Sequence, residues 1–334
     1  MIDNHTHLFE DAVDLVQYWE DFANAGIDKI GLLCVSNPFD SAVNDNARGL
    51  RMKRSFPDRV FLLPGCEYSF DDQRFRHQQS MYLSQQVDRY AAIGVDGWKC
   101  LEGKPGYHKY DLSGPFYSDF LDALTVHQLP LLIHVGDPIE FWNADTLPKW
   151  AFAEWYYDDR HPSLEYLRKD ALTMIEQHPD LIVVLPHFFF MSYELDSAAD
   201  LLAKHPNVLF DLAPGVEMFF GFSSDREQAQ AFFTTYQDRI LFGTDRGVAE
   251  MPAEPRASMI MRFLTTADSF DPPHSDVVMW PDDRAPIRGI DLPSPVVDKI
   301  TAQNFVDHFG AVPRALDEDL LQAELNRLRE IYGS

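Results

Sequence analysis

The sequence predicts an α/β protein that folds as a single-domain (β/α)8 TIM barrel. Eight short apolar runs alternate with amphipathic stretches along the chain, as a barrel of eight strand and helix units requires. The runs are almost continuously apolar, which is typical of parallel strands buried on both faces. A doubly wound open sheet is the rival fold, but no glycine-rich phosphate loop follows the first run. Although 334 residues could hold two domains, barrels of this size are commonly one, and we expect residues 1–334 to form one unit.

The individual elements follow from hydrophobic periodicity. We expect the eight strands at residues 2–8, 29–36, 60–67, 95–101, 130–136, 181–187, 208–213 and 240–245. Helices are expected between them at residues 12–25, 41–56, 78–93, 115–127, 163–178, 192–205 and 225–236. Residues 296–309 should form the helix that closes the barrel, and residues 317–332 a C-terminal helical appendage.

Two connections are too long to be simple turns. Residues 136–162 follow the fifth strand and are rich in tryptophan and tyrosine, while residues 268–295 follow the eighth repeat and are rich in proline and aspartate. Long loops after barrel strands often cover the active site, which lies at the C-terminal ends of the strands. We therefore expect the aromatic loop, with Trp142, to wall the pocket and contact substrate. Packing on the barrel rim or an oligomer contact is the alternative.

Composition excludes several classes of function. A formal net charge of -25 argues against a broad basic surface for nucleic acid or anionic membrane. There is no apolar run long enough to span a membrane and no signal-peptide pattern at the start, so a cytoplasmic location is the default expectation. The three cysteines, Cys34, Cys66 and Cys100, have no CxxC spacing and are interpreted as small buried hydrophobic residues.

Polar side chains that can bind metal recur at the ends of four predicted strands. His5 and His7 are two residues apart, so on a strand they project from the same face. His134 and His187 each close an apolar run, and Asp245 closes the last one. In a barrel these strands open onto one face, so the five side chains should converge. Three neutral imidazoles and a carboxylate suit Zn²⁺ or a similar divalent ion, with one position left for water whose pKa falls to about 7.

These motifs carry a resemblance to a known family. They are Ile2-Asp3-Asn4-His5-Thr6-His7, Ile133-His134, Leu185-Pro186-His187, Leu241-Phe242-Gly243-Thr244-Asp245 and the late stretch from Lys299 to Phe305. In this order, from Met1 to about Phe309, the chain resembles the type 2, or amidohydrolase-related, branch of the amidohydrolase superfamily. The resemblance implies that His5, His7, His134 and Asp245 are metal ligands. It also implies that His187 polarises the substrate or moves a proton.

The resemblance bears on Lys99, which ends the fourth strand. In binuclear members of the superfamily a lysine there is carboxylated and bridges two metals, whereas the type 2 branch is typically mononuclear. We expect one Zn²⁺ per chain, with Mn²⁺ or a second metal as alternatives. Lys99 should then face the substrate or pair with a carboxylate, for which Glu67 is the candidate. Glu67 is also expected among the residues that bind substrate. Arg246 could bind a substrate carboxylate or form a structural ion pair, and Glu217 is interpreted as a solvated loop acid.

The predicted reaction is hydrolysis of an ester, lactone or amide bond in a small substrate that can carry a carboxylate. Asp245 would take a proton from water on the metal, and His187 would stabilise or protonate the developing oxygen charge. Non-oxidative decarboxylation of an aromatic or unsaturated acid is the alternative, because the same branch contains such enzymes. No nucleic acid or membrane partner is expected, and a homodimer stays open because related barrels often form one.

Overall fold

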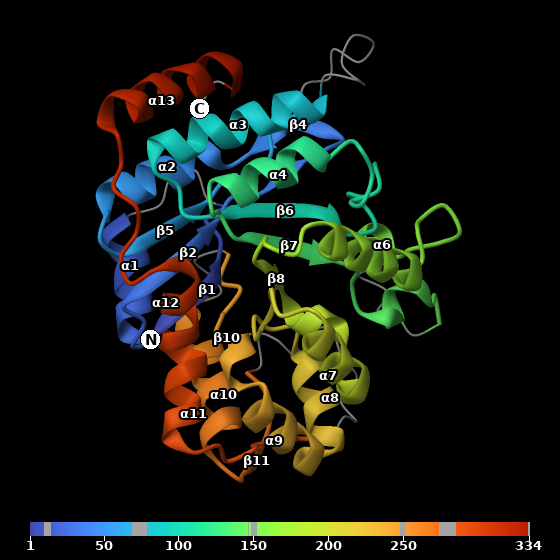
Figure 1. Cartoon of the computed structure of the whole chain (residues 1–334). Coiled ribbons are helices and arrows are strands. Elements are labelled where there is room, and N and C mark those ends of the chain that lie inside the picture. The colour runs from blue at the N-terminus through green and yellow to red at the C-terminus, as the bar shows by residue number, and fades with distance from the viewer. Residues whose placement is uncertain are drawn as a thin grey trace.

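Eight parallel strands form the centre of the computed structural model (Figure 1), which describes residues 1–9, 15–68, 79–145, 147, 152–247, 252–273 and 285–332. Each strand overlaps one of the eight predicted runs. They are β1 (Ile2–Thr6), β2 (Lys29–Leu33), β5 (Val60–Leu63), β6 (Trp98–Gly103), β7 (Leu131–Val135), β8 (Val183–Leu185), β9 (Val208–Asp211) and β10 (Ile240–Leu241).

Hydrogen bonds join the strands into a ring. The regular ladders run β1-β2-β5 and β10-β9-β8-β7-β6. At the β5–β6 seam, Asp96 N donates to Leu62 O at 2.9 Å, and Gly65 forms a parallel bridge with Lys99. At the other seam, Asn4 N donates to Phe242 O at 2.8 Å. The predicted (β/α)8 barrel is therefore confirmed, and the ends of all eight strands share one mouth.

Two apolar layers hold the barrel together. The inner layer fills the barrel with one or two side chains from each of seven strands, and Phe305 packs against them; the members are Ile2, Leu33, Phe61, Leu63, Leu132, Val184, Leu209, Leu241 and Phe305. The outer layer lies between the strands and the surrounding helices and includes Trp98, Leu131 and Phe210. Because strand side chains alternate between these layers, each strand must be apolar on both faces, as the sequence pattern indicated.

The surrounding helices largely match the predicted ranges. They are α1 (Leu15–Asn24), α2 (Asn46–Ser55), α3 (Gln79–Ile93), α4 (Ser118–Val126), α6 (Leu164–Gln177), α7 (Leu195–Lys204) and α9 (Arg226–Thr235). The prediction for residues 41–56 was wrong at its start, because Asp40–Asn44 form strand β4 and pair with β3 (Ser36–Asn37). Helices α8 (Val216–Ser224) and α10 (Ala253–Thr265) were not predicted.

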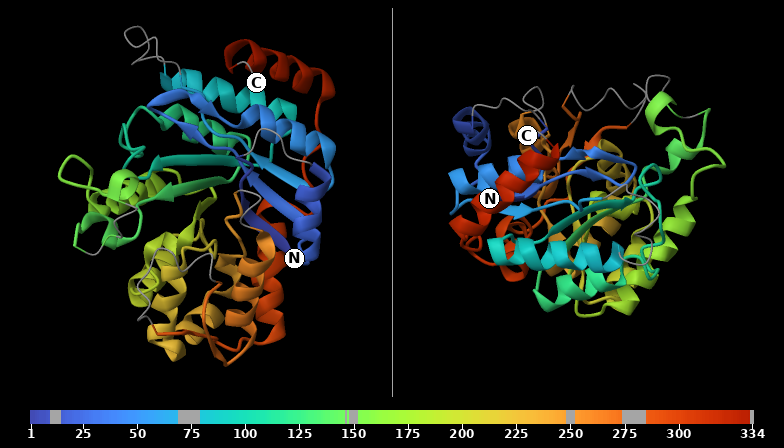
Figure 2. Two further views of the ribbon diagram at one scale, coloured as in Figure 1. Left: turned by 180° about the vertical axis from the view of Figure 1, so that it is seen from behind. Right: turned by 90° about the horizontal axis from the view of Figure 1, so that it is seen from above.

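The C-terminal region contains the two expected helical parts. The closing helix combines α11 (Ser294–Asp298), a π-helical turn (Lys299–Gln303) and α12 (Asn304–Phe309), and it ends at Gly310 with φ of 97°. After it, α13 (Glu318–Tyr332) lies against α2 and α3 on the outside of the barrel (Figures 1 and 2). In the described parts of the chain, no helix is both long and apolar enough to cross a membrane.

The two long connections are partly described. In the aromatic loop, a 3-10 turn (Ile139–Trp142) and α5 (Phe152–Trp155) pack together, whereas Trp150 lies outside the described residues. In the later connection, β11 (Ser269–Phe270) pairs antiparallel with β12 (Ile287–Arg288). Its residues 274–284 lie outside the described parts of the chain.

Candidate metal centre

His5, His7 and Asp245 bring three ligand atoms together at the mouth of the barrel. His5 Nε2 and His7 Nε2 are 3.3 Å apart, and they lie 3.4 and 3.5 Å from Asp245 Oδ1. Ligands bound tetrahedrally to zinc at about 2.0–2.1 Å are separated from one another by roughly 3.3–3.5 Å. The triangle thus has the size that a shared zinc-like ion requires, and residues from β1 and from the end of β10 meet as the sequence predicted.

Hydrogen bonds on the far side of each ring prepare these two histidines as ligands. His5 Nδ1 lies 2.9 Å from Asp211 Oδ2, and His7 Nδ1 lies 3.0 Å from Leu33 O. Both partners are acceptors, so each Nδ1 carries the proton and each Nε2 presents a lone pair. Burial lowers the pKa of His7 to about 4 and that of His5 well below 6.5, which keeps both neutral. Two lone pairs and a carboxylate in contact repel one another, and a bound cation would relieve that repulsion.

Asp211, at the end of β9, supports the centre and was not predicted. Besides the His5 ring, its carboxylate accepts hydrogen bonds from the Asn4 side chain at 3.2 Å, from His187 N at 2.8 Å and from Ala213 N at 3.1 Å. One buried side chain therefore positions a ligand and the backbone that carries His187. The sequence could have indicated Asp211, because it closes an apolar strand just as the candidate ligands close theirs.

Asp245 and the start of β1 are held by a second buried network. Asp3 accepts hydrogen bonds from Thr244 Oγ1 at 2.6 Å and from the backbone of Thr244 and His5. Arg256 donates to Asp245 O at 2.9 Å and approaches Asp245 Oδ2 at 4.0 Å. Burial opposes ionisation of Asp245, but the neighbouring histidines and Arg256 hold its pKa below its ordinary range. Asp245 is therefore an anionic ligand candidate.

His187 begins an unusual backbone turn. The four residues His187 to Phe190 all have φ between 53° and 55°, in the left-handed region that non-glycine residues rarely adopt. The turn directs the ring toward the centre, where Nδ1 donates to Ala213 O at 3.0 Å. Burial lowers the pKa of His187 to about 4, so the neutral ring presents Nε2 as an acceptor. His187 was predicted to protonate the developing oxygen charge, but the neutral ring must first receive a proton before it can donate one.

His134 lies beside the centre but is not part of the triangle. Its Nε2 is 2.9 Å from Gly136 O and 3.1 Å from Asp137 Oδ1, and its ring centre is 4.8 Å from that of His187. Asp137 is also bound by Lys104 at 2.8 Å. The metal-ligand role of His134 stays a prediction, and it needs the ring to exchange these contacts for the ion.

Lys99 lies on β6 near the candidate centre but does not line the pocket, and its substrate-facing role stays a prediction. Its side chain is buried, and its charge influences His5, Asp211 and Asp245. Burial lowers its pKa to about 8, although the nearby carboxylates oppose that shift. Within the described parts of the chain, its ammonium forms no ion pair. A cation in this position suits a substrate carboxylate.

Glu67 and Arg246 do not take the substrate-facing positions proposed for them. The Glu67 carboxylate points outward, where Arg327 of α13 binds both of its oxygens at 2.6 and 2.7 Å and Arg89 binds one at 3.1 Å. Arg246 is buried against α1, with Nε 3.1 Å from Asp21 and its guanidinium 4.0 Å from the centre of the Tyr18 ring. Glu67 as a partner of Lys99 was wrong, and for Arg246 the structural ion pair is confirmed.

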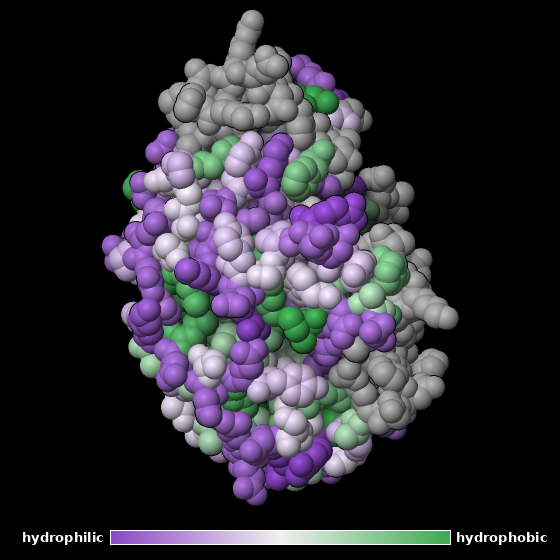
Figure 3. All heavy atoms as spheres, turned by 90° about the vertical axis from the view of Figure 1, so that its right-hand side faces the viewer, coloured by the Kyte–Doolittle hydropathy of each residue, from purple (hydrophilic) through white to green (hydrophobic). Residues whose placement is uncertain are grey.

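A pocket of about 190 Å³ opens onto the centre. Figure 3 shows the side of the molecule toward which β6 and β7 point, where apolar patches lie among polar residues. Lining residues are Lys104, His134, Asp137, Pro138, Phe141, Trp155, His187, Phe190, Pro214, Gly215, Glu217 and Asp245. The aromatic loop thus forms a wall, but through Phe141 and Trp155. Trp142, named as a substrate contact, instead donates to Pro162 O at 3.1 Å. Glu217 is buried in the pocket wall, so its interpretation as a solvated loop acid was wrong.

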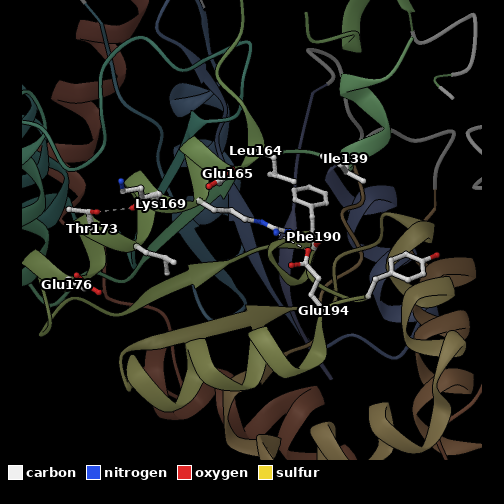
Figure 4. A pocket seen from close by; sticks show the side chains of 11 residues that line it. Ile139, Leu164, Glu165, Lys169, Thr173, Glu176, Phe190 and Glu194 are labelled. Carbon is white, nitrogen blue, oxygen red and sulfur yellow. Dashed lines mark hydrogen bonds and ion pairs between the residues drawn. The ribbon is translucent and has the colours of Figure 1, made fainter. Parts of the chain in front are cut away.

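A larger hollow of about 720 Å³ lies outside the barrel mouth along α6 (Figure 4). It shares only Phe190 with the pocket described above. Two of its charged residues, Arg168 and Glu194, pair with each other at 2.9 Å. None of the candidate metal ligands lines it, so the chemistry belongs to the smaller pocket.

The family model described as amidohydrolase matches residues 85–321, more than half of the chain. The chain belongs to the amidohydrolase family. The match includes His134, His187 and Asp245, whereas His5 and His7 lie before it and are placed by the geometry above. Members of this family are metal-dependent enzymes that include hydrolases and decarboxylases. A search of curated proteins found no match.

Solved structures support the fold of this amidohydrolase. An uncharacterised TIM-barrel protein from Bordetella bronchiseptica aligns with a TM-score of 0.58 at 14% identity, covering 93% of this chain and 99% of the other. A probable 2-pyrone-4,6-dicarboxylic acid hydrolase from Acinetobacter baumannii, solved with citric acid, aligns at 0.53 and 14%, covering 92% and 98%. A 5-carboxyvanillate decarboxylase from Novosphingobium aromaticivorans, solved with manganese and a nitrobenzoic acid, aligns at 0.56 and 12%, covering 92% and 95%. At these identities the likeness shows the barrel alone.

Proposed function

We propose that this amidohydrolase uses one divalent ion to hydrolyse an ester, lactone or amide bond in a small carboxylated molecule. The observation that carries the proposal is the triangle of His5, His7 and Asp245, whose edges of 3.3–3.5 Å fit a tetrahedral ion. Zn²⁺ is the first choice, because two imidazoles and a carboxylate are ligands it prefers, and Mn²⁺ is the alternative. His134 would supply a further ligand after its ring turns.

The residues around this site divide the chemistry between them. A bound divalent ion would lower the pKa of water to about 7 and polarise a substrate oxygen. Asp245 accepts the proton that the attacking water gives up. His187, whose Nε2 is free to accept, receives that proton and delivers it to the leaving group. The low pKa of His187 favours rapid release of the proton once it has been taken up.

The pocket supports a small, flat and anionic substrate. Phe141, Trp155 and Phe190 supply apolar walls, and a volume of about 190 Å³ leaves room for a single ring. Lys99 is buried near the candidate metal ligands and does not line the pocket, so a substrate carboxylate would have to reach past the lining to contact it; Lys104 lines the pocket but is engaged by Asp137. A charge-assisted contact to Lys99 would hold the carboxylate while the bond to be cleaved faces the ion.

Decarboxylation is the second candidate. The structural neighbours include a 5-carboxyvanillate decarboxylase with manganese and a nitrobenzoic acid bound, next to a probable pyrone dicarboxylic acid hydrolase. In that reaction a proton must reach a ring carbon as carbon dioxide leaves. His187 would have to enter that cycle protonated to donate the proton, whereas in hydrolysis it takes up the proton that the water gives up.

A substrate panel with two readouts tests the proposal. Zinc-loaded and manganese-loaded protein is assayed with small lactones, esters, amides and aromatic carboxylic acids for acid release and for carbon dioxide release. Hydrolysis should fall at least roughly 100-fold in Asp245→Asn and His187→Gln. Glu67→Gln, which changes a buried carboxylate outside the pocket, is the matched control and should retain turnover. Carbon dioxide release without hydrolysis would favour the second candidate, and turnover intact in both site variants would refute the assigned roles.

A further inference from the structure

Cys66, Cys100 and Glu102 form a second group of metal-ligating side chains, on the outer side of the barrel. Each offers a sulfur or carboxylate oxygen, and these atoms all lie within 4.8 Å of one another. The bridge between Gly65 and Lys99 puts Cys66 next to Cys100 on adjacent parallel strands, and Glu102 is two residues further along β6. All three side chains are buried, and both cysteines are free thiols.

Glu102 is a buried carboxylate with no paired cation in the described parts of the chain. Its Oε1 accepts a hydrogen bond from the Tyr68 hydroxyl, but its Oε2 is buried and has no hydrogen-bond partner. In the described parts of the chain, no lysine, arginine or histidine forms an ion pair with this carboxylate. Burial raises the pKa of Glu102, as expected for an acid without a compensating cation. An unpaired buried oxygen in this position needs an explanation.

Burial and the side chains of Cys66 and Glu102 raise the pKa of the Cys100 thiol, so a bound cation would be needed to hold it as a thiolate near neutral pH. The Trp98 indole Nε1 lies 3.3 Å from Cys66 Sγ and donates to it. A thiol sulfur is a weak acceptor, whereas a thiolate is a strong one, so this contact is worth more when Cys66 is deprotonated. Tyr117 also lies against the group, because the charges of Glu102 and Cys66 raise its pKa beyond the effect of burial. The site therefore combines acids with hydrogen-bond donors and lacks only a positive charge.

This group is separate from the candidate catalytic centre. Successive side chains on β6 point to opposite faces of the sheet, so Lys99 faces the barrel interior and Cys100 faces the helices. Trp98, on the same face as Cys100, packs against Tyr90 of α3 and Phe120 of α4, with ring centres 5.6 Å apart in both pairs. Both cysteines belong to the outer apolar layer. An ion held here would connect the segment after β5 to β6.

We propose that Cys66, Cys100 and Glu102 bind a second, structural divalent ion of the zinc class. Two thiolates and a carboxylate are ligands that Zn²⁺ takes in tetrahedral sites, and a tyrosine oxygen or water can complete the coordination. The ion would neutralise two of the three negative charges and engage the unpaired Oε2. This site does not depend on the proposed reaction, because it shares no residue with the pocket.

Cobalt substitution tests this site separately from the catalytic centre. Only a site with thiolate ligands gives sulfur-to-cobalt charge-transfer absorption in the near ultraviolet, and the His5 centre contains no sulfur. Protein purified under reducing conditions, stripped with chelator and loaded with Co²⁺ should show this band. It should bind about two ions per chain. The double variant Cys66→Ser/Cys100→Ser should lose the band and bind about one ion.

Three further variants keep the test decisive. Cys34→Ser removes a buried cysteine outside the group and should retain the band. His5→Ala should lose one ion and also retain the band. Glu102→Gln preserves the size of the side chain and should weaken cobalt binding at the sulfur site at least roughly tenfold, which gives a result even if the double variant does not fold. A wild-type protein without the band, or one with a Cys66–Cys100 disulfide under reducing conditions, would overturn the proposal.

Discussion

The substitution Asp211→Asn probes whether one buried carboxylate prepares the metal ligands. In the native protein, Asp211 accepts hydrogen bonds from the ring of His5, the side chain of Asn4 and two backbone amides. Asparagine has the same shape but replaces one acceptor oxygen by a donor. If the new amide faces His5, two donors oppose each other. His5 can then escape only by moving its proton to Nε2, which removes the lone pair that should bind the ion.

The expected effect is a loss of metal affinity. Mutation of a residue that orients a metal-bound histidine typically costs 10–100-fold in affinity, or about 1.4–2.8 kcal/mol. The substitution mainly disturbs one contact, the hydrogen bond between His5 and the Asp211 carboxylate. A hydrogen bond to a charged group contributes about 1.5–3 kcal/mol, which agrees with the expected loss of metal-binding free energy. If the amide flips instead, the backbone contact to His187 is lost and turnover should fall with the affinity.

Competition between the protein and a chelator of known affinity measures the change directly. Asp96→Asn is the matched control, since Asp96 is another buried carboxylate and accepts a hydrogen bond from Leu62 N at 2.7 Å, away from the candidate centre. This control should lower the thermal midpoint while leaving metal affinity unchanged. Equal metal affinity in Asp211→Asn and wild-type protein would refute the assigned tautomer of His5.

Three other outcomes are expected. Because burial lowers the pKa of His7 to about 4, protons compete with the metal only near that pH. As pH falls from about 7 to 5, chelator competition should show little metal release, and release with a midpoint near 6.5 would contradict the burial argument. Lys99→Met should raise KM for a carboxylated substrate about 10–100-fold with a smaller change for a neutral analogue. In wild-type protein the KM for the carboxylated substrate should rise as pH increases through about 8, where Lys99 loses its proton. If Lys99→Met raised KM equally for the carboxylated substrate and the neutral analogue, Lys99 would not contact the substrate carboxylate. Glu67→Gln should lower the free energy of unfolding by about 1–3 kcal/mol through its lost contacts with Arg327, without changing metal affinity or KM. A large change in KM would restore Glu67 to the substrate site.

Sequence reasoning was most successful where local pattern and geometry coincide. Continuous apolar runs mark strands buried on both faces, and all eight were found at or near their observed positions. The candidate ligands were found because parallel strands in a barrel end at one mouth, so a polar residue that closes an apolar run must lie there. Asp211 satisfies the same rule and could have been found by applying it to the seventh strand.

Errors arose where the direction of a side chain decides its role. Glu67 closes a strand but points outward, because Arg89 and Arg327 pair with it on that face. Trp142 belongs to the correct loop, yet its neighbour Phe141 reaches the pocket instead. Periodicity gives no information on these choices, because a position at a strand end or in a loop can face either way until helices pack around it.

The sequence by itself determined that this amidohydrolase is a barrel and which strand ends carry its candidate metal-binding side chains. Only the tertiary structure decided how they are used. It set the tautomers of His5 and His7 through acceptors contributed by other strands, directed His187 by a left-handed turn, and left His134 outside the triangle. The physical reason is that strand periodicity is a local property. Hydrogen-bond direction, burial and charge pairing depend on residues that meet only after the chain has folded.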